Sequence, residues 1–176
     1  MMDCFNMEKF ETCNQPIEII NALKDIEKTL TGFIVLSGKN GTGKTYVAKC
    51  VYNALNPYKS PDYDHDIAIF TTQAELNMSY NKILHKFGQV FTYLDYIRKT
   101  KLFVLDDLGT RTPTDAFMDF IYALVDYRYE NKLATIITTN LNSNDMRKNF
   151  SDAFVSRVAS GKCFRFEGKD RRSNPF

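Results

Sequence analysis

A short apolar run is followed at once by a glycine-rich loop, Phe33-Ile34-Val35-Leu36-Ser37-Gly38-Lys39-Asn40-Gly41-Thr42-Gly43-Lys44-Thr45, and this segment is the clearest indication of the fold. Residues 38–45 match the pattern G-x-x-x-x-G-K-[ST] at every position. The apolar run predicts a buried strand, and 44–55 predicts a helix. Glycines let the backbone curl so that N–H groups converge on phosphate oxygens, and the helix start adds unpaired amides. We therefore expect 38–45 to bind ATP, with Lys44 at the β- and γ-phosphates and Thr45 at Mg²⁺.

Outward from this stretch, apolar runs alternate with helical periodicities. Strands are expected at 33–36, 67–71, 102–105, 133–139 and 163–166, and helices at 17–30, 44–55, 73–87, 90–99 and 114–130. The central strands are apolar from end to end, as in a parallel sheet covered on both faces. The prediction is a three-layer α/β/α fold around a parallel five-stranded sheet, with little or no helical lid after the last strand.

Length and composition indicate one soluble domain. The 176 residues, 44% hydrophobic and 25% charged, are enough for a core. A net charge of +2 does not by itself indicate a nucleic-acid partner. The four cysteines form no C-x-x-C pair, which argues against a zinc site or a disulfide framework. No signal peptide or membrane span is recognisable, so we expect a cytoplasmic protein with no membrane partner.

Two acids follow the buried run 102–105. Asp106 ends a strand that we expect next to the strand of the phosphate-binding loop, which is where Mg²⁺ is held. Asp107 is the next residue and is expected to lie outside the hydrogen-bonded ladder of the sheet, where it can orient and polarise an attacking water. Asn140 ends the next strand and could hydrogen-bond that water or the γ-phosphate. Acidic turns and strand-ending asparagines are common, but their order after the phosphate-binding loop favours a catalytic interpretation.

Together these motifs resemble the AAA+ ATPases of the bacterial and phage replicative-helicase loader family (DnaC-like and DnaI-like), which are related to the IstB-type transposition ATPases. The resemblance covers nearly the whole chain and rests on Gly38–Thr45, Leu105-Asp106-Asp107-Leu108-Gly109, Asp126-Tyr127-Arg128-Tyr129, Thr138-Thr139-Asn140-Leu141, Ser156-Arg157 and the tail Phe166-Glu167-Gly168-Lys169-Asp170-Arg171-Arg172. It implies that Asn140 is the sensor-1 residue. It also implies that Arg157 is an arginine finger for ATP on a neighbouring subunit, and that Arg172, more than Arg171, fills the sensor-2 position.

The resemblance further implies an ATP-dependent replication factor that loads a DnaB-type replicative helicase onto single-stranded DNA. Such a protein assembles with itself or with another AAA+ protein, and hydrolysis is slow until assembly or DNA stimulates it. We expect one AAA+ domain over 1–176, with a lead-in and helix over 1–32, the core over 33–176, and no separate helicase-binding N-terminal domain.

Cations and aromatic residues alternate between 80 and 101, a composition that suits sequence-tolerant binding of a single strand. The better candidates for DNA contact are Lys82, Lys86, Arg98 and Lys99. However, Phe87, Phe91, Leu94 and Ile97 also have helical spacing, which is more typical of a core.

Three other functions stay open. A transposition-regulator ATPase that marks target DNA would carry almost the same motifs. A small P-loop kinase would need an acceptor pocket and an arginine-rich lid; the sequence has no such lid, and the pair Asp106-Asp107 favours water as the nucleophile. A non-catalytic adaptor would bind ATP without releasing phosphate.

Overall fold

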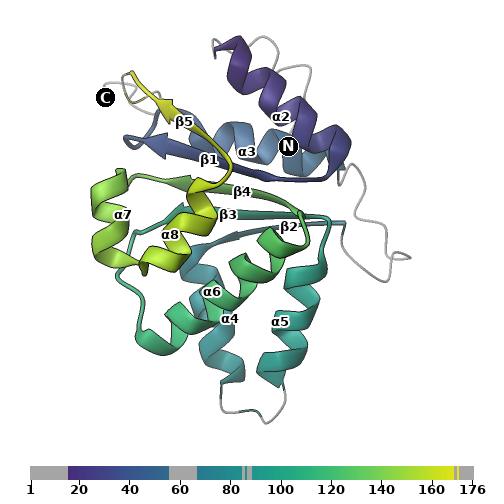
Figure 1. The fold of residues 1–176 in the computed structure, drawn as a ribbon, viewed down its shortest axis with the longest axis vertical. Helices are drawn as coiled ribbons and strands as arrows, with labels where there is room; N and C mark the ends of the chain where they lie inside the picture. The colour runs from purple at the N-terminus through teal and green to yellow at the C-terminus, as the bar shows by residue number, and fades with distance from the viewer. Residues whose placement is uncertain (1–15, 56–66, 85, 87–88, 169, 171–176) are drawn as a thin grey trace, which may run out of the picture.

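The computed structural model describes residues 16–55, 67–84, 86, 89–168 and 170 (Figure 1). Five parallel strands form one sheet in the order β2-β3-β4-β1-β5. The strands are β1 (Phe33–Gly38), β2 (Ala68–Thr72), β3 (Leu102–Leu108), β4 (Ala134–Thr139) and β5 (Lys162–Phe166). The predicted parallel five-stranded sheet is confirmed. The turn-rich loop that Pro57 and Pro61 predict over 57–65 lies outside the described residues.

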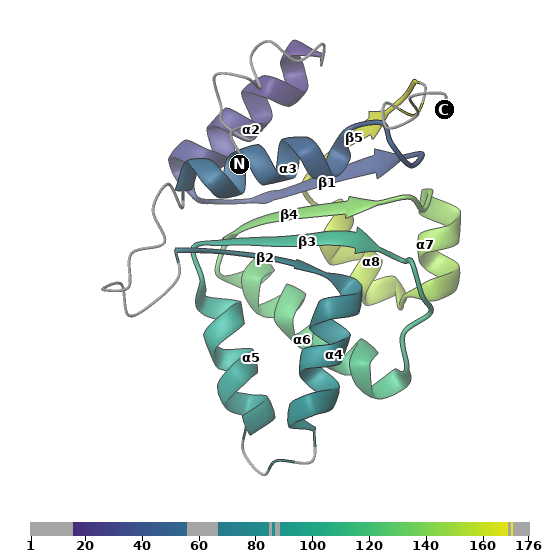
Figure 2. The ribbon, with the colours of Figure 1, turned by 180° about the vertical axis from the view of Figure 1, so that it is seen from behind.

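Helices cover both faces of the sheet. They are α2 (Ile17–Thr29), α3 (Lys44–Leu55), α4 (Gln73–Ile83), α5 (Gln89–Lys99), α6 (Asp115–Glu130), α7 (Ser143–Asn149) and α8 (Asp152–Ala159). Figure 2 shows α2 and α3 on one face and the other five helices on the opposite face. This is the three-layer α/β/α arrangement that the alternation of strands and helices predicts.

Strand β1 explains why both faces need a cover. Successive side chains of a strand point to opposite faces. Ile34 and Leu36 accordingly pack in the core under α2 and α3, whereas Phe33 and Val35 pack in the core against α6 and α8. Because all four side chains are buried, this part of the strand is apolar without interruption.

The strand order corrects one expectation. Strand β3, which carries Asp106, does not lie next to β1, because β4 pairs with both of them. Parallel strands end at the same edge of a sheet, so the residues that follow β1, β4 and β3 form one row. This row places Asn140, after β4, between the phosphate-binding loop and the acidic pair.

Helices α7 and α8 were not predicted. Each begins at a side-chain cap, since Asn142 accepts from the backbone N–H of Asp145 at 2.9 Å and Ser151 accepts from that of Phe154 at 3.3 Å. Their apolar residues pack in the larger core beside α6. Within the described residues, no helix is long and apolar enough to cross a membrane.

Arg128, in the last turn of α6, is fully buried and has a structural role. Its guanidinium donates to the carbonyl oxygens of Thr100 at 2.8 Å and Ala134 at 2.5 Å, and to Thr135 Oγ1 at 2.9 Å. It thereby joins the end of α5 to the starts of β3 and β4. Burial lowers the pKa of Arg128 to about 9.

Candidate functional site

The phosphate-binding loop joins β1 to the first turn of α3, as the sequence predicts. Within the loop, Thr42 is buried and its Oγ1 donates to the carbonyl oxygen of Lys39 at 2.9 Å. Gly41 has a φ of +73°, a conformation that side chains rarely adopt. The first turn of α3 adds the positive end of the helix dipole. The loop therefore has the form of an anion-binding site.

Lys44 connects this loop to the end of β4. Its side chain is 5% exposed. Nζ donates to the carbonyl oxygens of Gly38 and Lys39 and to Asn140 Oδ1, each at 2.8 Å. Asn140 itself is exposed one residue beyond β4. The ammonium group and the amide thus lie together at the carboxyl edge of the sheet.

Asp106 is the buried acid of the site, 3% exposed in β3. Its carboxylate accepts from Thr45 Oγ1 at 2.9 and 3.1 Å and from Thr138 Oγ1 at 2.6 Å. Burial raises the pKa of Asp106 above its ordinary value, while the two hydroxyl donors act in the opposite direction. Hydroxyl and carboxylate oxygens are ligands that Mg²⁺ prefers, so Thr45 and Asp106 fit that ion.

Asp107 lies at an irregularity in β3. The register with β4 shifts between Leu105 and Leu108, so the acidic pair faces a single residue, Thr138. Asp107 has a φ of +55°. Its backbone N–H donates to Thr138 Oγ1 at 3.0 Å. The bulge gives the two adjacent acids different surroundings, because Asp106 is buried and Asp107 is half-buried.

Sequence reasoning did not assign a role to Thr138. Its hydroxyl donates to Asp106 and accepts from Asp107, which makes it the link between the acidic pair and the strand that ends at Asn140. A buried threonine in a β-branched strand gives no separate signal in the sequence.

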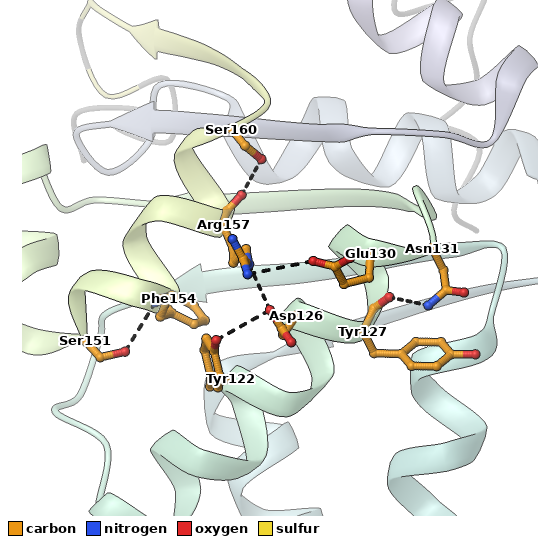
Figure 3. A network of polar contacts seen from close by, with 9 residues as sticks. All are labelled: Tyr122, Asp126, Tyr127, Glu130, Asn131, Ser151, Phe154, Arg157 and Ser160. Atoms are coloured by element: carbon orange, nitrogen blue, oxygen red, sulfur yellow. Dashed lines mark hydrogen bonds and ion pairs between the residues drawn. The ribbon is translucent and has the colours of Figure 1, made fainter.

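Arg157 lies in the last turn of α8 and points toward α6 (Figure 3). Its Nε donates to Asp126 Oδ1 at 2.8 Å, Nη2 is 3.8 Å from Glu130 Oε1, and the guanidinium lies 4.6 Å from the ring centre of Tyr129. The hydrogen bond to Asp126 raises the pKa of Arg157 above its ordinary value. Within the described part of the chain, no hydrogen bond or ion pair joins Arg157 to the phosphate-binding loop.

Asp170, which follows β5 in the chain, contacts the phosphate-binding loop. The carboxylate of Asp170 lies against Gly41, where a Cβ would collide with it. A cavity of about 220 Å³ lies beside the loop, between Lys39 and Arg165. Arg171 and Arg172 lie outside the described residues.

The aromatic and basic residues between 80 and 101 divide into two groups. Tyr80 and Tyr93 contact Phe120 in the core. In contrast, Phe91 is 78% exposed on α5. Two of the predicted DNA-contacting cations are paired on their own helix, since Asp95 accepts from Arg98 Nη2 and Lys99 Nζ, each at 2.6 Å.

The sheet order, the loop after β1, the acidic pair in β3 and the polar residue after β4 together define an AAA+ P-loop protein. The family model described as "IstB-like ATP binding protein" matches residues 5–159. The chain therefore belongs to the IstB-like ATP-binding protein family.

One relative and two solved structures illustrate these similarities. The chain is 30% identical over 124 residues to the inferred ATP-binding protein of insertion sequence IS232 from Bacillus thuringiensis subsp. berliner, covering 68% of this chain and 44% of that protein. The fold is similar to that of a replication initiator DnaA bound to AMPPCP and single-stranded DNA, with a TM-score of 0.80, 18% identity, and coverage of 95% of this chain and 51% of that one. It is also similar to the DnaC helicase loader, with a TM-score of 0.73, 20% identity, and coverage of 93% and 97%.

Proposed function

We propose that the protein is an ATPase that couples ATP binding and hydrolysis to the handling of single-stranded DNA. The hydrogen-bonded set of Thr45, Asp106 and Thr138 carries the proposal, because it unites the phosphate-binding helix with the two strands beyond it. A glycine-rich turn without a function would have no need of a buried acid such as Asp106, which comes from β3, two strands away from β1 in the sheet.

In this proposal Thr45 and Asp106 hold Mg²⁺, which would neutralise charge on the β- and γ-phosphate oxygens. The backbone N–H groups of 38–45 bind the phosphates. Lys44 exchanges its contacts with two loop carbonyls for phosphate oxygens, since an ammonium group has three donors to distribute. Asn140, already within 2.8 Å of Lys44 Nζ, lies where its amide can contact the γ-phosphate or the attacking water.

Asp107 is the proposed base that orients the attacking water. It is less buried than Asp106 and lies on the same edge of the sheet. Water is a poor nucleophile, so a carboxylate that accepts its proton and fixes its direction accelerates attack. The division of roles follows from position: Asp106 is hydrogen-bonded to Thr45 at the phosphate-binding loop, and Asp107 is one residue further on.

We propose that Arg157 completes the site of a neighbouring subunit. A guanidinium is permanently charged and has a planar fork of donors that suits phosphate oxygens. Arg157 is one-third exposed and held in place by α6, so it is oriented on the surface without contact to its own loop. Arg172 is the proposed sensor-2 residue, and Asp170, two positions before it in the chain, contacts Gly41.

The hairpin of α4 and α5 is the proposed DNA contact. Most of the exposed large hydrophobic side chains in the described residues lie on it: Met78, Leu84, Phe91 and Tyr96. Lys82 and Lys86 are exposed nearby. Exposed aromatic faces and unburied cations are what sequence-tolerant single-strand binding uses. Arg98 and Lys99 are weaker candidates, because their pairing with Asp95 would have to be broken.

Helicase loading is the proposed cellular role. Regulation of transposition is the second candidate, favoured by the 30% identical relative from an insertion sequence. The chain spans less than half of that relative and about half of the DnaA chain. Capture of purified DnaB-type helicase in the presence of ATP would support the first role, and capture of a transposase would support the second.

The test of the proposed ATPase separates binding from hydrolysis. Wild type and Asp107→Asn should bind a fluorescent ATP analogue with Mg²⁺ equally well, while only wild type releases phosphate at a measurable rate with single-stranded DNA. Binding without phosphate release in both would show an adaptor instead of an ATPase.

A further inference from the structure

The turn that follows Asp107 is held on several sides by side chains. Thr139 Oγ1 donates to the carbonyl oxygen of Leu108 at 2.7 Å, from β4. Gly109, with a φ of +90°, lies against the side chain of Leu141, which occupies the space that a Cβ would need. These contacts come from β4 and the residues after it.

A contact from another element completes this set. The side chain of Gln73, in the first turn of α4, is buried at 3% exposure. Its Oε1 accepts from the backbone N–H of Gly109 at 2.7 Å, and its Nε2 donates to the carbonyl oxygen of Arg111 at 2.8 Å. One amide thus pairs with both a donor and an acceptor of the segment that follows the acidic pair.

The position of Gln73 is itself fixed. Thr72 caps α4 by accepting from the N–H of Glu75 at 3.1 Å, and the Glu75 carboxylate accepts from the N–H of Thr72 at 2.9 Å. Thr72 also pairs in register with Asp106 in β3. The side-chain amide of Gln73 therefore extends from the capped first turn of α4, directly beside β3, the strand that carries Asp106 and Asp107.

We infer that Gln73 is a positioning residue for hydrolysis, fixing the turn that aims the Asp107 carboxylate at the attacking water. The inference rests on the proposed ATPase function. Asp107 has left-handed backbone geometry at a bulge, so its direction depends on what holds the residues after it. A displacement of a reacting group by about 1 Å can lower a rate by up to roughly 100-fold.

The experiment compares Gln73→Met with Gln73→Glu. Methionine has a similar volume and makes neither hydrogen bond, whereas glutamate keeps an acceptor for the Gly109 N–H and loses the donor to Arg111. Asn77→Ala, one turn further along α4 and partly exposed, is the control. We expect kcat for ATP to fall about tenfold in Gln73→Met and at least as far in Gln73→Glu, because the second carboxylate oxygen of glutamate would face the carbonyl oxygen of Arg111. KM and the affinity for Mg·ATP should stay within about twofold, and Asn77→Ala should match wild type.

An unchanged kcat in Gln73→Met would overturn the inference, and so would equal losses of kcat and nucleotide affinity, which indicate a purely structural role. A measurement that does not depend on ATP hydrolysis distinguishes failure of this inference from failure of the ATPase proposal. If wild type releases no phosphate, the exchange rate of the Gly109 amide hydrogen still tests whether the side chain of Gln73 holds this turn. Faster exchange in Gln73→Met than in Asn77→Ala is expected; equal exchange in the two variants would contradict it.

Discussion

Lys44 and Asn140, 96 positions apart in the chain, are joined by a hydrogen bond of 2.8 Å between Nζ and Oδ1. The bond connects the phosphate-binding loop to the end of β4, and Thr138 in the same strand binds Asp106. One strand therefore contacts both the residue proposed for the phosphates and the residue proposed for Mg²⁺. Because β4 lies between β1 and β3, its last residues can reach both.

Asp106→Asn should raise stability at neutral pH while it abolishes Mg²⁺-dependent hydrolysis. Burial raises the pKa of Asp106 in the folded state. Such an acid stabilises the fold fully below its unfolded pKa, and this contribution is lost as pH rises through the folded pKa. At neutral pH the buried negative charge is therefore a cost that asparagine removes.

Thermal unfolding at two pH values measures this effect. We expect the Tm of Asp106→Asn to exceed that of wild type by about 2–4 °C at pH 7.5 without Mg²⁺. The difference should shrink toward pH 4, where wild-type Asp106 is increasingly protonated. A variant with a lower Tm than wild type at both pH values would contradict this interpretation.

Arg157→Ala should lower assembled ATPase activity by roughly a thousandfold if the guanidinium acts on a neighbour's ATP. Arg147→Ala is the matched control, because Arg147 is also ion-paired on this side of the molecule, with Asp152 at 3.1 Å. Mixing Arg157→Ala with Asp107→Asn should restore part of the activity, since some interfaces then combine an intact finger with an intact site. No recovery, or a silent Arg157→Ala, would count against action between subunits.

Phe91→Ala should weaken binding of single-stranded DNA by about 5- to 150-fold, the range expected for loss of one stacked base. Ile17→Ala is the control, since Ile17 is similarly exposed but lies on α2 across the sheet. Fluorescence anisotropy of a labelled oligonucleotide measures both. Equal affinities for the two variants would remove the hairpin from the DNA surface.

Arg128→Met should lower the free energy of unfolding by about 3 kcal/mol, because the buried carbonyl oxygens of Thr100 and Ala134 lose their charged donor. Urea denaturation gives this value. Arg98→Met, at a partly exposed position on α5, should cost much less. Similar losses in the two variants would mean that burial of Arg128 is not what makes it structurally important.

The sequence predicted the sheet and the phosphate-binding loop well because their signals are local. Phe33 to Leu36 is apolar without interruption, and a complete motif follows it. The relative places of the strands were harder to predict. We expected β3 beside β1, but β4 lies between them, and strand order depends on which crossovers the helices make.

The missed features depend on contacts distant in sequence. Met146, Phe150, Phe154 and Val158 recur every four residues and all are buried. That spacing could have indicated helix, but two helices divide the segment at Phe150 and Ser151. Gln73 gave no signal, because a glutamine in the first turn of a helix is ordinary until Gly109 is found beside it.

Phosphate release from Mg·ATP shows whether a neighbouring subunit completes the site. It is measured for wild-type protein across a range of protein concentrations, with single-stranded DNA present and Lys44→Ala as the reference. We expect activity per subunit to rise with protein concentration and Lys44→Ala to have no activity. Activity per subunit that stays constant with concentration, or no phosphate release from protein that binds Mg·ATP, would contradict a site completed by a neighbouring subunit.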